Sequence, residues 1–293
     1  MDQIQEFCRQ YHFPDEAFSA LAAGWETLQG NENANKVFLA QIDVYKNDMN
    51  FDYHPVFDAL HALQETTGVH MYTIDLLFLI KLMPLLKAHY MEKAYPMECY
   101  EGFANNLRSY LIDCKNHFDV WGTSIGWWLV AFFKLKCFTI GRHQYKPKVF
   151  KETKGSEAFP LPAGQPYLDI HVPPEGPLTP ELCQASYKAA ADFFRKYFGY
   201  TDVIVTAATW LLSPDLEDML PPHSNILSWA HDYTLLEVHE DKDYHTMHYY
   251  FNLSTLPEDF NDLPENSSLQ RAVKAHLLAG KTLKTGFGAL RVE

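Results

Sequence analysis

Apolar residues recur at every third or fourth position through the first 118 residues, which is the spacing of an amphipathic helix. The pattern is clear in four segments: 13–28, 31–48, 54–67 and 97–118. A fifth segment, 73–95, is apolar almost all round, so it is predicted to be the buried central helix. Together these patterns predict an all-helical N-terminal domain at 1–118.

The period changes after the segment "DVWGTSIGWWLVAFF" (119–133). β-Branched and aromatic residues predict strands in four segments: 134–141, 142–150, 167–172 and 202–212. The last of these strands is predicted to run into a short helical turn. Segments 179–198 and 267–280 have helical spacing, and 233–251 is predicted to be a hairpin with its turn around Asp241. This order predicts an α+β fold, with an α/β-type mixed sheet in a C-terminal domain at 119–293.

The composition argues against several classes of protein. Apolar residues make up 47% of the 293 positions, enough for sizeable cores. The formal charge is -13, and the one basic stretch, 134–154, is spread over predicted strands, so we expect no nucleic-acid partner. The first residues lack the pattern of a signal peptide, and the apolar runs are too short to span a bilayer. We therefore expect a cytoplasmic protein with no membrane association.

Neither the cysteines nor the histidines form a metal-binding pattern. The five cysteines are far apart and include no CxxC pair, which also argues against a disulfide framework. His239, His245 and His248 cluster in the predicted hairpin, but strand alternation points His245 to the opposite face from the other two. We expect no metal site.

The segment "VPPEGPLTPE" (172–181) links a predicted strand to a predicted helix, a place where many proteins hold an anion. Its four prolines carry no backbone N–H, and its two glutamates would repel a phosphate. Thr179 is expected to be the N-cap residue, with Pro180 at the first helical position. The turn is therefore predicted to cap its own helix and to lack a phosphate cradle.

Four blocks and a short C-terminal run carry a family resemblance: "FTIGRHQY" (138–145), "IHVPPEGPLTPELCQASYKAAADFF" (170–194), "TWLLSPDLEDMLPPHSNI" (209–226), "SSLQRAVKAHLLAG" (267–280) and "GFGAL" (286–290). They resemble the GNAT-like acyltransferases that pair a helical N-acyltransferase N-terminal domain with a GNAT-like C-terminal domain. The resemblance implies a mixed sheet that opens after its fourth strand and holds an acyl-CoA in the gap. It also implies acyl-CoA as a co-substrate, with no tightly bound cofactor, and a small-molecule amine as acceptor. An acyl carrier protein is the alternative donor, and it would dock on the basic stretch 134–154.

The resemblance also implies roles for single residues. His171, at the end of the presumed fourth strand, would be the catalytic base, since imidazole titrates near neutral pH. The alternative for His171 is a hydrogen bond to a loop carbonyl. Two sets of residues complete the expected site: Val172, Gly176, Thr179 and Trp210 beside the CoA, and Arg142, Gln144 and Asn225 toward the substrate.

Two features depart from the family pattern. The glycine-rich Q/R-x-x-G-x-G/A loop that cradles the CoA pyrophosphate is replaced by the proline-rich turn, and no tyrosine lies between Thr201 and Ser228 to serve as a general acid. A second hypothesis therefore stands beside the enzyme. In it the chain is a binding or regulatory module that keeps the GNAT-like shape and has lost the CoA pyrophosphate loop. For Asn225, capping of a turn is the alternative to ligand binding.

Overall fold

The computed structural model describes residues 3–253 and 255–293, which form two compact units. The helical unit extends to Thr139 and also includes the short segment Pro173–Glu175. The sheet unit comprises Ile140–Val172 and Gly176–Glu293. The chain therefore passes between the units three times, and two of these passages lie within the predicted turn at 172–181.

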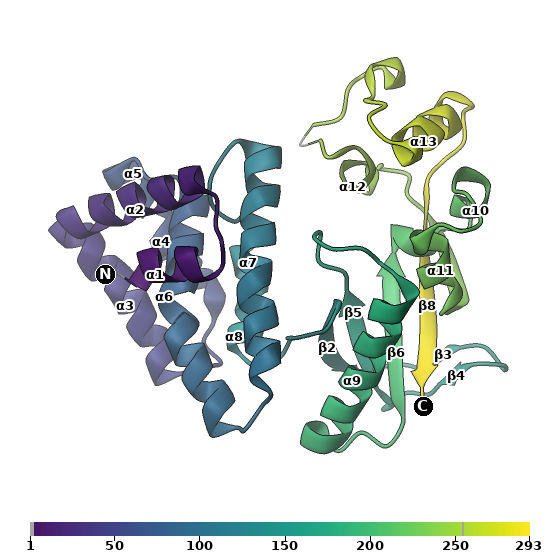
Figure 1. Ribbon diagram of the computed structural model, residues 1–293, viewed down its shortest axis with the longest axis horizontal. Coiled ribbons are helices and arrows are strands. Elements are labelled where there is room, and N and C mark those ends of the chain that lie inside the picture. Colours follow the sequence, from purple (N-terminus) through teal and green to yellow (C-terminus); the bar gives the residue numbers. More distant parts are fainter. Residues whose placement is uncertain (1–2, 254) are drawn as a thin grey trace. The chain divides into compact units, whose positions relative to one another are not determined.

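The helical character predicted from apolar spacing for the N-terminal part of the chain is confirmed. Its helices, labelled in Figure 1, are α1 (Gln3–Gln10), α2 (Asp15–Gly30), α3 (Glu32–Asn47), α4 (Tyr53–His61), α5 (Leu63–Thr67), α6 (Met71–Glu92), α7 (Met97–Phe118) and α8 (Gly126–Phe133). α6 contacts six of the other helices: α1, α2, α3, α4, α7 and α8. Consecutive side chains from Leu76 to Ile80 are fully buried, as expected for a central helix that is apolar all round.

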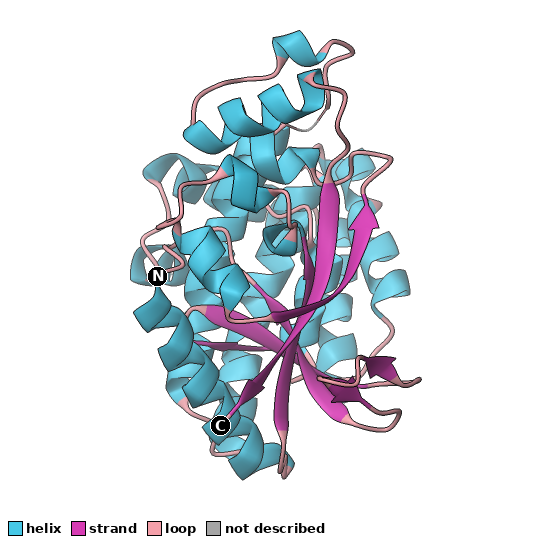
Figure 2. Ribbon diagram, turned by 90° about the vertical axis from the view of Figure 1, so that its right-hand side faces the viewer, coloured by secondary structure: helices cyan, strands magenta, loops and turns pink. Residues whose placement is uncertain are grey.

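The sheet unit is built on a six-stranded mixed sheet with the order β1-β2-β5-β6-β8-β7. Its strands are β1 (Phe138–Ile140), β2 (His143–Val149), β5 (Pro166–His171), β6 (Val203–Thr209), β7 (Thr234–Glu240) and β8 (Lys284–Val292). β5 and β6 are parallel, whereas the pairs β2–β5, β6–β8 and β7–β8 are antiparallel. A separate hairpin of β3 (Lys154–Gly155) and β4 (Pro160–Leu161) lies to one side of the sheet (Figure 2).

The helices of the sheet unit lie in two places. The long helix α9 (Pro180–Phe198) packs on one face of the sheet against β2, β6 and β8. α11 (Asn225–His231) contacts α9. The other short elements gather beyond the end where β6 stops and β8 begins (Figure 1): η1 (Trp210–Leu212), α10 (Leu216–Met219), α12 (Met247–Phe251), η2 (Phe260–Asp262) and α13 (Ser268–Leu278). Their buried side chains form a core of their own that includes Leu216, Met247 and Val273. The predicted α+β architecture is confirmed.

The predicted hairpin at 233–251 is wrong. The chain leaves β7 at Glu240, and the Asp241 carboxylate accepts hydrogen bonds from the backbone N–H groups of His245 and Thr246, at 2.9 and 2.7 Å. This arrangement starts a helix in place of a returning strand, and α12 follows. β7 pairs instead with β8, a strand that the sequence did not predict.

Residues 3–253 and 255–293 contain neither a membrane-spanning helix nor a cluster of metal-binding side chains. No helix in these ranges combines the length and the apolar character needed to cross a membrane. Nor do these ranges bring three histidine, cysteine, aspartate or glutamate side chains together as a metal site would require.

Candidate functional site

The sheet opens between its two parallel strands. β5 and β6 share only two Cα pairs, Leu168 with Val205 and Asp169 with Thr206. Beyond these pairs β5 continues to His171 and β6 to Thr209, without pairing with each other. Each strand keeps its other neighbour, since Gln144 of β2 pairs with His171 and Gly286 of β8 pairs with Thr209. The two halves of the sheet therefore diverge after Asp169, and His171 lies on β5 beyond the last shared pair.

His171 shares its face of the sheet with other charged groups. Antiparallel Cα partners lie on the same face, and Tyr145 with its partner Ile170 lies on the α9 face, because Tyr145 hydrogen-bonds to Ser186 of α9. The neighbouring pairs Gln144–His171 and Lys146–Asp169 therefore lie on the opposite face.

Asp169 is the charged partner of His171. Its Oδ2 lies 3.5 Å from Nε2 of His171, at the outer limit of hydrogen-bond length, and 2.5 Å from Nζ of Lys148. Burial alone raises the pKa of the Asp169 carboxyl, but His171 and Lys148 beside it outweigh burial and hold that pKa below its usual value. Asp169 is therefore ionised at neutral pH. A carboxylate can only accept, so a hydrogen bond between the two groups would use the proton of Nε2 of His171.

The α9 face of the same strands is closed by a buried network around His143. Trp229 Nε1 donates to Nε2 of His143 at 3.1 Å, so the proton of the neutral ring resides on Nδ1, which donates to Ser186 Oγ at 3.1 Å. Ser186 Oγ in turn donates to the carbonyl oxygen of Ile140 at 2.5 Å and accepts from the Tyr145 hydroxyl at 2.8 Å. Every donor and acceptor of Ser186 Oγ is used, and both ring nitrogens of His143 are occupied. His143 therefore has no free nitrogen for proton transfer.

The turn after β5 is held by Arg142. Its guanidinium donates to the carbonyl oxygens of Gly176 at 2.8 Å and Pro177 at 3.0 Å. Gly176 has a positive φ of 94°, which glycine adopts without strain. Thr179 occupies the N-cap position of α9 as expected, although its side chain makes no capping hydrogen bond. The arrangement orients carbonyl oxygens, not N–H groups, toward the cation.

The comparisons with known proteins agree with this geometry. Residues 137–290, more than half of the chain, match the family described as "GNAT-like C-terminal domain", and residues 2–135 match "N-acyltransferase N-terminal domain". The chain belongs to the GNAT-like C-terminal domain family. The predicted family resemblance and the predicted pairing of the two domains are confirmed. No curated protein matches the chain.

Several solved structures share this GNAT-like architecture. One is described as an acyltransferase in complex with decanoyl-CoA and teicoplanin; it is 21% identical, with a TM-score of 0.69, and the match covers 98% of this chain and 87% of the other. Another, an acyltransferase in complex with decanoyl-CoA, is 22% identical with a TM-score of 0.66, and the match covers both chains completely. At these identities the likeness establishes the fold.

The structure distributes the predicted site residues over three places in the GNAT-like domain. His171, Val172 and Gln144 lie at the paired ends of β5 and β2, where the sheet opens. Arg142, Gly176 and Thr179 lie together at the turn before α9. Two predicted residues lie in the shorter elements that follow β6: Trp210 and Asn225.

Trp210 packs against a hydrophobic core, and Asn225 lies at the start of a helix. The Trp210 ring lies 4.5 Å from the ring of Tyr250 and packs on the core of the shorter helices. Asn225 is exposed at the first position of α11, directly after the N-cap Ser224, whose hydroxyl accepts from the backbone N–H of Ile226 at 3.2 Å. Ser224 thus caps the start of α11 at the turn where capping was the alternative to ligand binding.

Asp169 and Lys148 were missed by the sequence reasoning. For Asp169 a signal was present, because "LDIH" places it two residues before His171 and therefore on the same face of a strand. For Lys148 there was none, because its contact depends on the register between β2 and β5.

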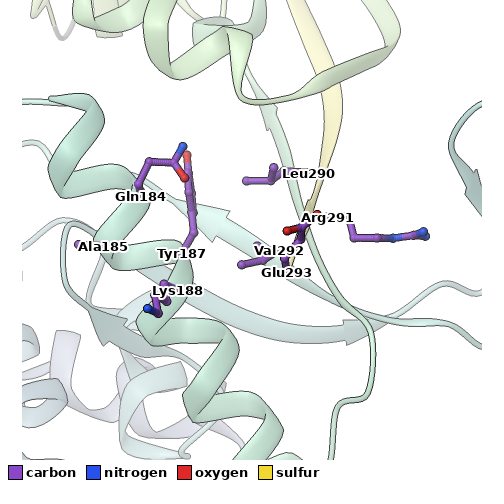
Figure 3. A pocket seen from close by; sticks show the side chains of 8 residues that line it. All are labelled: Gln184, Ala185, Tyr187, Lys188, Leu290, Arg291, Val292 and Glu293. Carbon is purple, nitrogen blue, oxygen red and sulfur yellow. The ribbon is translucent and has the colours of Figure 1, made fainter.

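The sheet unit also contains a cavity of about 470 Å3 between α9 and β8. Gln184, Tyr187 and Lys188 line it from the helix, and Leu290 and Val292 from the strand (Figure 3). Val292 and Leu290 pair with Val203 and Val205, before the point where β5 and β6 separate. The cavity is therefore distinct from the opening of the GNAT-like sheet.

Proposed function

We propose that the protein is an N-acyltransferase that moves an acyl group from acyl-CoA to a small-molecule amine. The observation that carries the proposal is the divergence of β5 from β6 directly beside His171 and Asp169. A thioester placed between diverging strands can be approached by strand backbone groups that have no sheet partner on that side. Family membership in both halves of the chain supports the same reaction class.

The chemistry uses His171 as the base. The nitrogen of the acceptor attacks the thioester carbonyl carbon, the C–N bond forms, and the C–S bond breaks. The proton of the attacking nitrogen passes to the imidazole of His171 and then to the departing thiolate, so the products are the amide and free CoA thiol. Asp169 keeps the ring oriented and stabilises the charge that His171 gains for a moment.

The donor and the acceptor are proposed as chemical classes. Solved relatives are described in complex with decanoyl-CoA, which supports an acyl-CoA donor here. An acyl carrier protein is the competing donor, and the basic stretch 134–154 is where its acidic surface would dock. One relative is described in complex with teicoplanin, which supports a small-molecule acceptor. We place the reaction in the cytoplasm, in keeping with five cysteines that are all free.

The test is release of CoA thiol from acetyl-CoA through decanoyl-CoA in the presence of a panel of amines. We expect His171→Asn to lower kcat by about a hundredfold to ten-thousandfold, the range for loss of a general base, while binding of acyl-CoA in a thermal-shift titration persists. The matched control is His239→Asn, an exposed histidine of β7 that should leave turnover unchanged. Equal turnover in wild type and His171→Asn would contradict the role of His171.

A non-catalytic binding module is the second candidate, and the turn before α9 favours it. The prolines there lack N–H groups, and Arg142 occupies the carbonyl oxygens of Gly176 and Pro177. The same titration separates the two candidates. Binding of acyl-CoA by the wild type without thiol release from any donor and amine would favour the module.

A further inference from the structure

We propose that Lys148 is a positioning residue of the transfer reaction: it holds the Asp169 carboxylate against His171 and offsets the negative charge of that carboxylate. This deepens the proposed function and rests on it. The inference starts from one oxygen atom, since Nζ of Lys148 and Nε2 of His171 both approach Oδ2 of Asp169.

The contact geometry makes Lys148 the stronger partner of Asp169. Its Nζ lies 2.5 Å from Oδ2, whereas Nε2 of His171 lies 3.5 Å away. The Asp169 side chain is only 17% exposed, so this ion pair is screened less than one at the surface. The carboxylate is therefore fixed from the β2 side, and its orientation determines where the imidazole is held.

The charge on Lys148 also has an electrostatic effect. An unpaired Asp169 would strongly favour the protonated form of His171, and a protonated imidazole cannot accept the proton of the acceptor amine. By neutralising most of this negative charge, Lys148 leaves the ring orientation intact and weakens the pull on the proton. The arrangement keeps His171 oriented and basic at once.

Other charged and titratable groups near His171 must be considered in any pH argument. On the same face, β2 contributes Lys146, the Cα partner of Asp169, and β5 contributes Tyr167, the Cα partner of Lys148. Arg142 is a further cation, engaged with the turn carbonyl oxygens. Glu175 of the turn belongs to the helical unit, where its carboxylate accepts from Arg108 and Ser109, at 2.9 and 2.8 Å.

Lys146 provides a matched control. It lies on the same face and directly opposite Asp169, yet within residues 3–253 and 255–293 no ion pair joins it to an acidic side chain. Lys146→Met therefore removes the same charge from the same strand and leaves the Lys148 contact in place. A change in the titration of His171 caused by loss of charge at a distance would appear in both variants. A change caused by loss of the contact with Asp169 would appear only in Lys148→Met.

The experiment follows the ring signals of His171 by NMR as a function of pH, with the signal identified by its loss in His171→Asn. We expect Lys148→Met to raise the titration midpoint by about half a pH unit or more, and Lys146→Met to raise it by less than half as much. Lys148→Arg keeps the charge and should restore the wild-type midpoint. If the Met variant fails to fold, Lys148→Gln replaces it.

A double-mutant cycle tests the route through Asp169. In an Asp169→Asn background, removal of Lys148 should shift the midpoint no more than removal of Lys146 does. Equal shifts in Lys148→Met and Lys146→Met, or a full shift that persists in the Asp169→Asn background, would overturn the proposal. Because this titration requires no turnover, it can be read even if the protein transfers no acyl group. In an active enzyme, the pH at half-maximal kcat/KM should move with the midpoint.

Discussion

His143 and His171 lie on opposite faces of neighbouring strands, and their surroundings give them different chemistry. Both ring nitrogens of His143 are engaged, and the ring is stacked on Tyr187 with centroids 5.1 Å apart. Burial, assisted by the nearby charge of Arg142, lowers the pKa of His143 from 6.5 to about 3. His143 therefore stays neutral at neutral pH and serves packing, whereas the proposed role in proton transfer belongs to His171.

The state of His143 makes folding stability depend on pH. The unfolded chain binds a proton at this residue below about pH 6.5 and the folded chain does not until about pH 3, so stability falls as the pH falls through that window. This one group accounts for a slope of up to about 1.4 kcal/mol per pH unit. We expect His143→Gln to be less stable at pH 7 and to show a smaller slope between pH 6.5 and 4.5, measured by urea unfolding at successive pH values.

His239→Gln is the control for this prediction, because it removes a histidine that is largely exposed. Its slope should match that of the wild type, and an unchanged slope in His143→Gln would contradict the neutral, buried state.

At the residue scale, the sequence predicted where single residues lie in a strand, but it did not predict which residues pair across neighbouring strands. It placed His171 at the end of a strand, but the Lys148 contact arises from a cross-strand register that no local pattern encodes.

β8 is the element that joins the sheet, because it pairs with β6 on one side and β7 on the other. The prediction of two strands at 134–150 and of the strand and turn at 202–212 succeeded because their patterns are local. The hairpin prediction failed because the partner of β7 is more than forty residues further along the chain. Met247, Tyr250 and Phe251 are buried at helical spacing, a signal that alternation of polar residues obscured.

Gly286 shows how closely β8 is packed. It pairs with Thr209 and Val238, and a Cβ atom there would lie 2.3 Å from the carbonyl oxygen of Leu212. We expect Gly286→Ala to destabilise the sheet unit by about 1–3 kcal/mol, because the closest atom is a backbone oxygen and the side chains of Leu212 and Leu235 crowd the same space. Gly30→Ala is the comparison, since nothing lies within 4 Å of its added methyl group. Equal melting temperatures for both variants would argue against the observed packing of β8.

At the scale of the whole molecule, the two units share one chemical property: their cysteine side chains are buried. All five cysteines are free and buried: Cys8, Cys99, Cys114, Cys137 and Cys183. Burial raises the pKa of three of these thiols to about 12, those of Cys8, Cys99 and Cys114. The same cause raises the pKa of Cys183 to about 11. Thiolate is the reactive form, so all of these groups are protected.

We therefore expect the native protein to react negligibly with a chromogenic disulfide reagent at pH 8, and the protein unfolded in guanidinium to release five equivalents. The measurement is a time course of absorbance under both conditions. A fast equivalent from the native protein would show that one of these side chains is exposed in solution. The expected result also means that thiol release in the transferase assay comes from CoA.

The strand order of the sheet has a consequence for biosynthesis. During translation β7 leaves the ribosome well before β8, and it has no other partner in the sheet. Until β8 emerges, both edges of β7 are open, together with Leu235 and Val238, which stay partly exposed even in the finished fold. The growing chain thus passes through a period in which an apolar strand is available to other nascent chains, and protection by a chaperone would matter most in that interval.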